Sequence, residues 1–205
     1  MNIVFDFGVV LFTWQPDRFL PDFFPIRASS PELARALATD VFSHADWHAF
    51  DQGTLTTGEV VQRTSKRLDL DVQVLTGLVA AIPDLLTPVA GTVDILERLV
   101  LRRRLKGDVS LYFLSNMPVP IARVLEQRHP FLSGFEGGIF SGDVKLVKPQ
   151  PEIFDLMQQR FALQPGKTLF IDDLQRNVEA ARTCGWNAVQ FVSPDQLHQH
   201  LARLL

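Results

Sequence analysis

Four short apolar runs, rich in residues that favour β-strands, recur along this chain and are separated by longer segments with helical periodicity. The runs cover residues 2–7, 109–115, 168–171 and 188–192. Strands that alternate with helices pair in parallel, because each helical crossover returns the chain to the same end of the sheet. We therefore predict an α/β fold built on a doubly wound parallel sheet.

The connection between the first two predicted strands, residues 8–108, is far longer than a crossover helix requires. Within it, residues 16–83 indicate several helices and no convincing strand, whereas residues 91–104 indicate the crossover helix itself. Ser30, followed by Pro31 and Glu32, marks the start of one of these helices. We predict a helical cap over residues 16–83, inserted after the first strand, and a core made of residues 1–15 and 84–205.

The composition excludes several classes of protein. A formal net charge of −3 argues against a nucleic-acid-binding surface, which needs a clustered basic excess. No run of 18 apolar residues exists that would predict a membrane span. Cys184 is the single cysteine and therefore cannot form an internal disulfide, and Met1 is followed directly by a strand. We expect a cytoplasmic protein that has a small-molecule substrate and no membrane partner.

Polar side chains stand where three of the predicted strands end. In a parallel α/β sheet the ligand crevice lies off the carboxyl ends of the strands, so these side chains are expected to meet. A lysine in the loop before Pro149 can join them. The residues are Asp6 after the first strand, Ser115 and Asn116 after the second, Lys148 in the loop, and Asp172 and Asp173 after the third.

The residue types in this set suggest chemistry on a phosphate group. Asp6 can act as a nucleophile, although a residue of this kind also caps helices. Asp172 and Asp173 repel each other unless a cation intervenes, and carboxylate oxygens suit Mg²⁺. The Ser115 hydroxyl and the backbone N–H groups that follow it can bind phosphate oxygens, although Ser-Asn is also common turn chemistry.

In this chain order, the aspartate, serine, lysine and double aspartate resemble the four motifs of the haloacid dehalogenase-like hydrolase superfamily. The resemblance implies a Rossmann-like core with a helical cap, and Asp6 as the nucleophile that forms an aspartyl phosphate. It implies Mg²⁺ held by Asp6, the backbone carbonyl of Gly8 and Asp173. Asp172 then acts in the metal site through water or by orienting Asp173.

The same resemblance assigns roles to the remaining polar residues. Ser115 and Asn116 would bind the phosphate group. Lys148 would neutralise charge between Asp6 and the phosphate, because the family pattern places the catalytic lysine directly before a proline; Lys145 is the nearby competitor. The branch with bacterial α-glucose-1-phosphate phosphatases is similar in its Asp-x-Gly first motif and in a cap segment like residues 47–53, which implies a small phosphomonoester, such as a sugar phosphate, as substrate.

One departure from the family pattern concerns Gly8. Most phosphatases of the superfamily carry a second aspartate there, which serves as general acid and base. Without it we expect a preference for good leaving groups, unless another group such as His48 or Asp51 of the cap supplies the proton. True haloacid dehalogenases also lack this aspartate, so a 2-haloacid dehalogenase is one alternative, and a catalytically weakened phosphate-binding protein is another.

Overall fold

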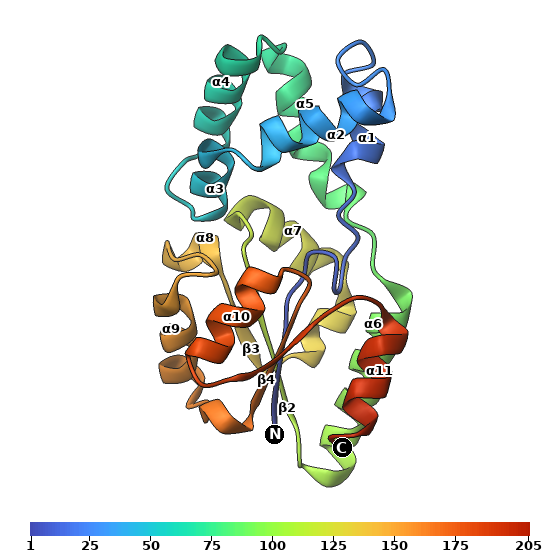
Figure 1. The fold of residues 1–205 in the computed structure, drawn as a ribbon, viewed down its shortest axis with the longest axis vertical. Helices are drawn as coiled ribbons and strands as arrows, with labels where there is room; N and C mark the ends of the chain where they lie inside the picture. Colours follow the sequence, from blue (N-terminus) through green and yellow to red (C-terminus); the bar gives the residue numbers. More distant parts are fainter.

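Five parallel strands form the centre of the protein, and the computed structural model describes them together with every other residue of the chain, 1–205. The strand order is β3-β2-β1-β4-β5, so the chain winds outward in both directions from β1. Helices cover both faces of this sheet, and a separate group of helices lies beyond one end of it (Figure 1). The strands are β1 (Asn2–Phe5), β2 (Ser110–Ser115), β3 (Gly137–Phe140), β4 (Thr168–Asp172) and β5 (Asn187–Gln190).

The predicted α/β class and doubly wound parallel sheet are confirmed. In the register of the sheet, Phe5 is paired with Phe113 of β2 on one side and with Ile171 of β4 on the other. The carboxyl ends of these three strands therefore stand side by side, at the point where the order of the sheet reverses. This is the position at which α/β sheets bind ligands.

Strand β3 was not predicted from the sequence, and β5 ends at Gln190 rather than at Val192. The segment of β3 begins with two glycines, so it lacks the run of β-formers that marks a strand. A Cβ atom at Gly138 would lie 2.4 Å from the ring of Phe113, so glycine permits the close approach to β2. β5 stops where its partner β4 stops, because Gln190 pairs with Asp172, the last residue of that strand.

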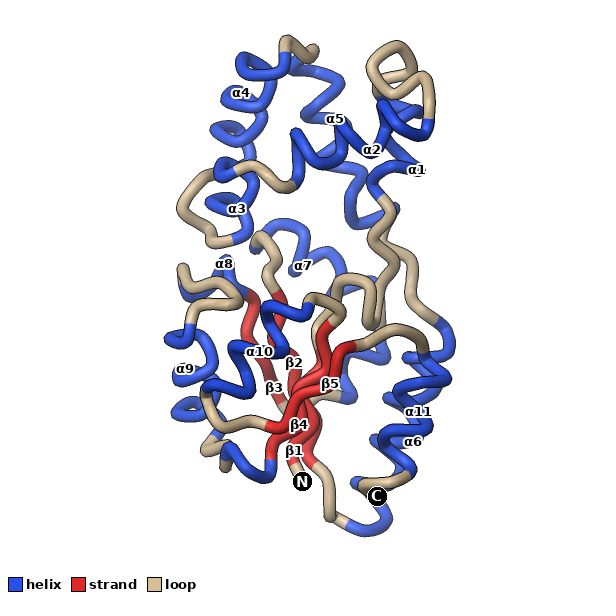
Figure 2. Tube along the Cα trace, viewed as in Figure 1, coloured by secondary structure: helices blue, strands red, loops and turns tan.

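Alternating side chains of β1 reach the two layers of the core. The core helices are α6 (Ala90–Lys106), α7 (Val119–Arg128), α8 (Ser141–Val144), α9 (Pro151–Phe161), α10 (Gln175–Thr183) and α11 (Pro194–Ala202), with 3₁₀ turns at Pro130–Gly134 and Pro165–Lys167. Ile3 and Phe5 belong to the larger apolar cluster, which includes residues of α6, α7 and α11, whereas Val4 belongs to a smaller cluster with residues of α9 and α10. The layers on both sides of the strands are visible in Figure 2.

The helical group after β1 contains five helices and no strand. As expected, Ser30 caps one of them by accepting a hydrogen bond from the Leu33 N–H, and another begins with a capping box between Thr56 and Glu59. No helix in the structure combines the length and the apolar character that crossing a bilayer requires. The five are α1 (Pro16–Phe23), α2 (Pro31–Phe42), α3 (Ala45–Asp51), α4 (Thr57–Leu68) and α5 (Val72–Leu85).

Candidate active site

Asp6 follows β1 at the central strand end. The residue is 7% exposed, and its Oδ1 accepts hydrogen bonds from the Phe7 N–H at 2.7 Å and from Lys148 Nζ at 2.8 Å. Burial raises the pKa of Asp6 to about 7, and Lys148 partly offsets this by lowering it. Asp6, the expected nucleophile, is thus paired with a lysine. Below pH 7 its carboxylate stays ionised only if further positive charge lowers its pKa.

Lys148 lies between two carboxylates. Its Nζ is 2.8 Å from Asp6 Oδ1 and 2.7 Å from Asp172 Oδ2, and the side chain is 1% exposed. Burial by itself lowers the pKa of Lys148, but the charges of Asp172 and Asp6 outweigh burial and raise it above the ordinary value. The competitor Lys145 is exposed and makes no ion pair, so the geometry favours Lys148 as the lysine of this site.

Asp172 is completely buried and uses both of its oxygens. Oδ1 accepts from the Leu174 N–H at 2.8 Å, Oδ2 accepts from Lys148, and Asn177 Nδ2 donates to both oxygens at 3.0 Å. These bonds direct Asp172 toward Lys148, whereas the family resemblance implied a role in the metal site, through water or by orienting Asp173. Asn177 was not predicted as a site residue. In the sequence it stands out only as an amide near the start of a predicted helix. In the structure its side chain is buried and therefore needs a hydrogen-bond partner, which Asp172 provides.

Asp6, Asp172 and Asp173 form the one cluster of possible metal ligands in this site. Each offers an oxygen, and these three atoms lie within 4.8 Å of one another. Burial and the neighbouring charge of Asp172 raise the pKa of Asp173 to about 6. Three clustered carboxylates against one lysine leave a net negative charge, so the donor set fits a hard divalent cation such as Mg²⁺.

The turn after Asp6 presents the backbone expected to complete that donor set. The Gly8 carbonyl accepts from the Val10 N–H at 2.7 Å, and a carbonyl oxygen keeps a second lone pair for another partner. Val9 has a φ of 61°, which is rare for a β-branched residue and marks local strain beside the site. Gly8 itself does not have positive φ, and a Cβ atom there would meet nothing within 4 Å.

Ser115 and Asn116 lie at the end of β2 and line the same cavity as Asp6. Ser115 ends β2 and is 1% exposed, with no hydrogen bond from its hydroxyl to another side chain. The Asn116 amide instead joins the backbone of Lys148, where Nδ2 donates to the carbonyl and Oδ1 accepts from the N–H. Asn116 thus positions the lysine segment, which the sequence did not indicate.

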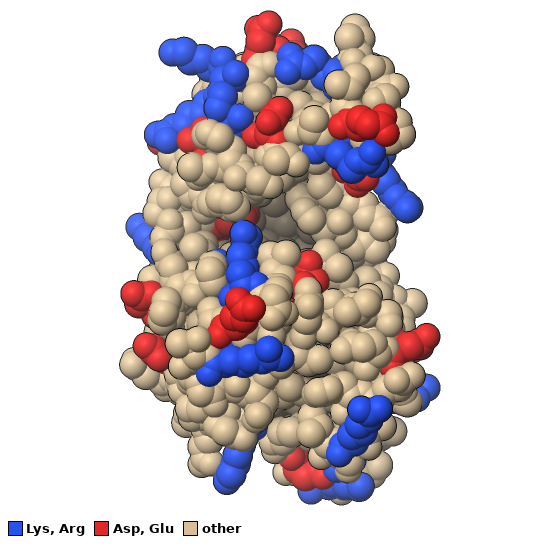
Figure 3. All heavy atoms as spheres, in the orientation of Figure 1, with Lys and Arg blue, Asp and Glu red and all other residues tan.

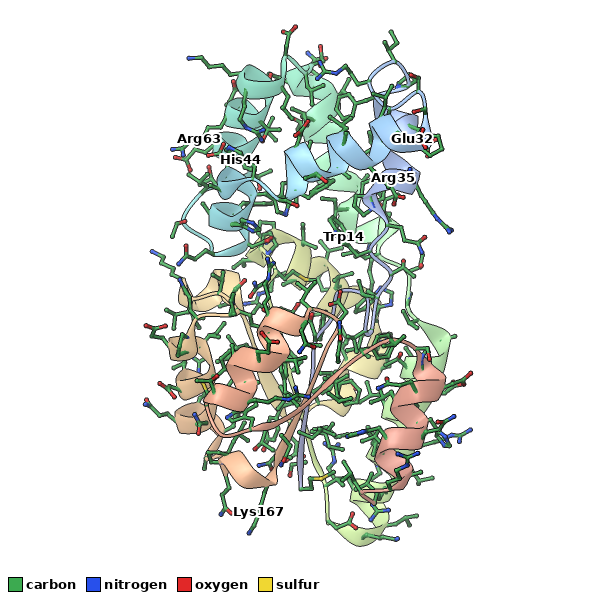
Figure 4. All side chains as sticks on the ribbon, in the orientation of Figure 1. Trp14, Glu32, Arg35, His44, Arg63 and Lys167 are labelled. Carbon is green, nitrogen blue, oxygen red and sulfur yellow. The ribbon has the colours of Figure 1, made fainter.

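A cavity of about 410 Å³ opens above these groups, between the sheet and the five helices. Figure 3 shows the hollow on this face of the molecule. Trp14, which lies on a connecting segment between the two parts (Figure 4), belongs to its wall, and its ring stands edge-on to Phe42. The apolar part of the wall is formed by Val9, Trp14, Pro16, Ala38, Phe42, Trp47, Ile82, Leu86, Met117, Pro118, Ile121 and Leu174.

The predicted site residues are therefore brought together at one cavity, lined by Asp6, Gly8, Ser115, Asn116, Lys148 and Asp173, and Asp172 contacts Lys148. The sequence missed Asn177, as well as Ser141, whose hydroxyl accepts from the Met117 N–H at 2.8 Å. Ser141 follows the unpredicted strand β3, so no sequence signal marked it. The catalytic and metal-binding roles of the predicted residues remain predictions.

Comparisons with known proteins point to one family. A model described as haloacid dehalogenase-like hydrolase matches residues 27–185, a span that begins after Asp6. The sesquiterpene phosphatase astK of Aspergillus oryzae is 25% identical over 183 residues, which cover 89% of this chain and 85% of that protein.

Solved structures share the fold. The magnesium complex of the HAD family enzyme BT-2542 from Bacteroides thetaiotaomicron has a TM-score of 0.75 at 22% identity and covers 98% of both chains. An L-2-haloacid dehalogenase from Xanthobacter autotrophicus, with chloropropionic acid covalently bound, has a TM-score of 0.70 at 17% identity, over 98% of this chain and 82% of that one. At these identities the likeness concerns the fold alone.

Proposed function

Because this chain belongs to the haloacid dehalogenase-like hydrolases, we propose that it is a Mg²⁺-dependent phosphatase that hydrolyses a small phosphomonoester through an aspartyl-phosphate intermediate. The observation that carries the proposal is the cluster of Asp6, Asp172 and Asp173, whose oxygens lie within 4.8 Å of one another. A carboxylate that displaces halide from carbon needs no metal ion beside it. A carboxylate that attacks an anionic phosphoryl group does, because the two negative charges repel each other.

In this proposal each residue has a defined task. Asp6 Oδ2, which is free of the Lys148 contact, attacks phosphorus. Lys148 and Ser115 stabilise charge on the transferred phosphoryl oxygens. Asp6, Asp173 and the Gly8 carbonyl would hold Mg²⁺, which supplies electrostatic stabilisation of the phosphoryl group when bound. Asp172 keeps Lys148 in place through its 2.7 Å contact.

The proposal also divides the chain into a cap and a catalytic core. Residues 16–83 act as a cap that excludes water, and residues 1–15 and 84–205 form the catalytic core. Segment 13–18, which ends in the first turn of α1, and the return segment after α5 are the two places at which the cap can open and admit substrate. The single Cys184 has no partner for a disulfide, which is compatible with the reducing cytoplasm as the site of action.

We propose two candidate classes of substrate. The family resemblance of the sequence implies a sugar phosphate. The apolar wall of the cavity and the sesquiterpene phosphatase among the relatives favour an alcohol with hydrocarbon character, since apolar side chains leave sugar hydroxyls without hydrogen-bond partners. Comparing kcat/KM for hexose 1-phosphates and prenyl monophosphates in the presence of Mg²⁺ separates the two classes.

The decisive experiment measures hydrolysis of 4-nitrophenyl phosphate. We expect activity that requires added Mg²⁺, is abolished by chelation and is absent from Asp6→Asn, which keeps the size of the side chain and removes the nucleophile. Activity that survives chelation would contradict the metal site. The alternative, a 2-haloacid dehalogenase, is favoured by Gly8 and predicts release of chloride from 2-chloropropionate in metal-free buffer, faster than any phosphate ester is cleaved.

A further inference from the structure

The lack of an acid at Gly8 leaves the leaving oxygen of a phosphate ester without an obvious proton donor. Gly8 lines the cavity, and the space where its Cβ would stand is open, with no atom within 4 Å. Among the other ionisable core groups, Lys148 is paired with Asp172, and Asp6 and Asp173 are the proposed ligands of Mg²⁺. The cap side of the cavity is therefore the remaining source of a proton donor.

Two titratable residues of the cap line the cavity, His48 and Asp51, both on α3. His48 is exposed, whereas Asp51 is partly buried at the last position of the helix. The carboxylate of Asp51 makes no hydrogen bond or ion pair with another protein group, although its backbone carbonyl does. A partly buried carboxyl without a protein partner loses hydration and gains no stabilising contact in return, which is typical of a functional group.

The backbone around Asp51 is fixed against the catalytic core. Its carbonyl accepts a hydrogen bond from the Ser141 hydroxyl, and that hydroxyl in turn accepts from the Met117 N–H, two residues after Ser115. Gln52 Nε2 donates to the Lys145 carbonyl at 2.9 Å. Gly53, with a φ of +74°, lies so close to α8 that a Cβ there would be 2.4 Å from the Gly142 carbonyl oxygen.

These contacts hold the backbone of Asp51 against the core, and Asp51 and Asp6 line the same cavity. We propose that Asp51 is the general acid and base of the reaction, in place of the aspartate that Gly8 replaces. The proposal rests on the proposed phosphatase function. Burial raises the pKa of Asp51 well above its ordinary value, with no contribution from the other charged groups of the cavity, which are Lys148, Asp173, Arg176 and Asp6.

The two half-reactions then balance. As Asp6 attacks, the bond between phosphorus and the ester oxygen breaks, its electron pair goes to that oxygen, and the oxygen takes the proton of the Asp51 carboxyl. A water molecule next attacks the phosphorus of the aspartyl phosphate and gives a proton to the Asp51 carboxylate. The bond from phosphorus to Asp6 breaks, so inorganic phosphate leaves and both aspartates return to their starting states.

The test compares leaving groups under single-turnover conditions with Mg²⁺, so that only the first step is measured. Asp51→Asn keeps the size of the side chain and loses the proton. We expect its rate with 4-nitrophenyl phosphate to stay near that of the unmodified protein, because 4-nitrophenolate leaves without a proton. With an alkyl phosphate we expect a fall of about 10² to 10⁴. The unmodified protein should show a shallower dependence on leaving-group pKa than Asp51→Asn.

Asp46→Asn is the matched control, because Asp46 lies on the same helix but forms an ion pair with Arg63 and does not line the cavity. It should leave both rates unchanged. Equal losses with both esters in Asp51→Asn, or no loss with the alkyl ester, would overturn the proposal. A selective loss in His48→Gln but not in Asp51→Asn would overturn it as well. Failure of the phosphatase assignment would look different, since the unmodified protein would then cleave neither ester.

Discussion

The side-chain amide of Asn116 brackets the backbone of Lys148. Asn116 Nδ2 donates to the Lys148 carbonyl at 2.9 Å, and Asn116 Oδ1 accepts from the Lys148 N–H at 2.8 Å. The strand end that carries Ser115 is thereby tied to the loop that carries the lysine. Since the loop is held through its backbone, a substitution of the lysine side chain removes a charge from the site without releasing the loop.

Lys148→Met should therefore lower turnover of 4-nitrophenyl phosphate strongly. Loss of one preorganised electrostatic contact typically costs about 10² to 10³ in rate. Lys145→Met is the control, because Lys145 is exposed and unpaired, and it should act at nearly the normal rate. Steady-state kinetics at saturating Mg²⁺ measure both variants. The lysine assignment would be wrong if Lys145→Met were the more damaging change.

The two adjacent aspartates should differ in their effect on the metal. Asp173→Asn removes a proposed direct ligand and should raise the Mg²⁺ concentration needed for half-maximal activity. Asp172→Asn should lower kcat by about 10- to 100-fold with a smaller effect on that concentration, because Asp172 positions Lys148. Mg²⁺ titrations of activity distinguish them, and equal shifts in the Mg²⁺ requirement would erase the distinction.

Mg²⁺ binding should weaken as the pH falls. The pKa of Asp6 is raised to about 7 and that of Asp173 to about 6, so above pH 7 both carboxylates are free to bind a cation. As the pH drops through 7 and then 6, protons compete for the same oxygens. Calorimetric titration of the metal-free protein with Mg²⁺ at pH 8, 7 and 6 measures this. An affinity that does not change over the range would contradict it.

The raised pKa values of Asp6 and Asp173 also make the stability of the metal-free protein depend on pH. Between the ordinary pKa of 3.8 and the raised values, the folded protein binds more protons than the unfolded chain, so the free energy of unfolding of the metal-free protein should decrease as the pH rises. Added Mg²⁺ should restore stability at pH 8 by binding the ionised carboxylates. Thermal unfolding with and without Mg²⁺ at pH 5 and pH 8 tests the sign.

Closure of the cap should depend on Gly53. An alanine there is strained at a φ of +74° and would collide with the Gly142 carbonyl, so Gly53→Ala should weaken the contact between the end of α3 and α8. We expect a higher KM and a loss of stability of about 1 kcal/mol or more. Gly58→Ala is the matched control, because a Cβ at Gly58 meets nothing within 4 Å. A KM unchanged in Gly53→Ala would show that the contact does not matter for substrate binding.

Local sequence was sufficient for the strands that carry Asp6, Ser115 and Asp172, because each is a run of buried apolar β-formers that ends in a polar residue. It was also sufficient for helix starts such as Ser30, since a cap is a contact between residues three apart. Parallel pairing then required the three strand ends to meet, so the composition of the site could be predicted before its geometry was known.

Strand β3 depends on long-range packing, because its two glycines have no strand propensity and are favoured only where the ring of Phe113 leaves no room for a Cβ. The hydrogen bonds of Asp172 also depend on long-range packing, because Lys148 and Asn177 reach the same carboxylate from different segments. The position of Asp51 is likewise set by Ser141, which is 90 residues away in the sequence. Neighbouring residues cannot encode such contacts, since they form only when segments far apart in the sequence pack together.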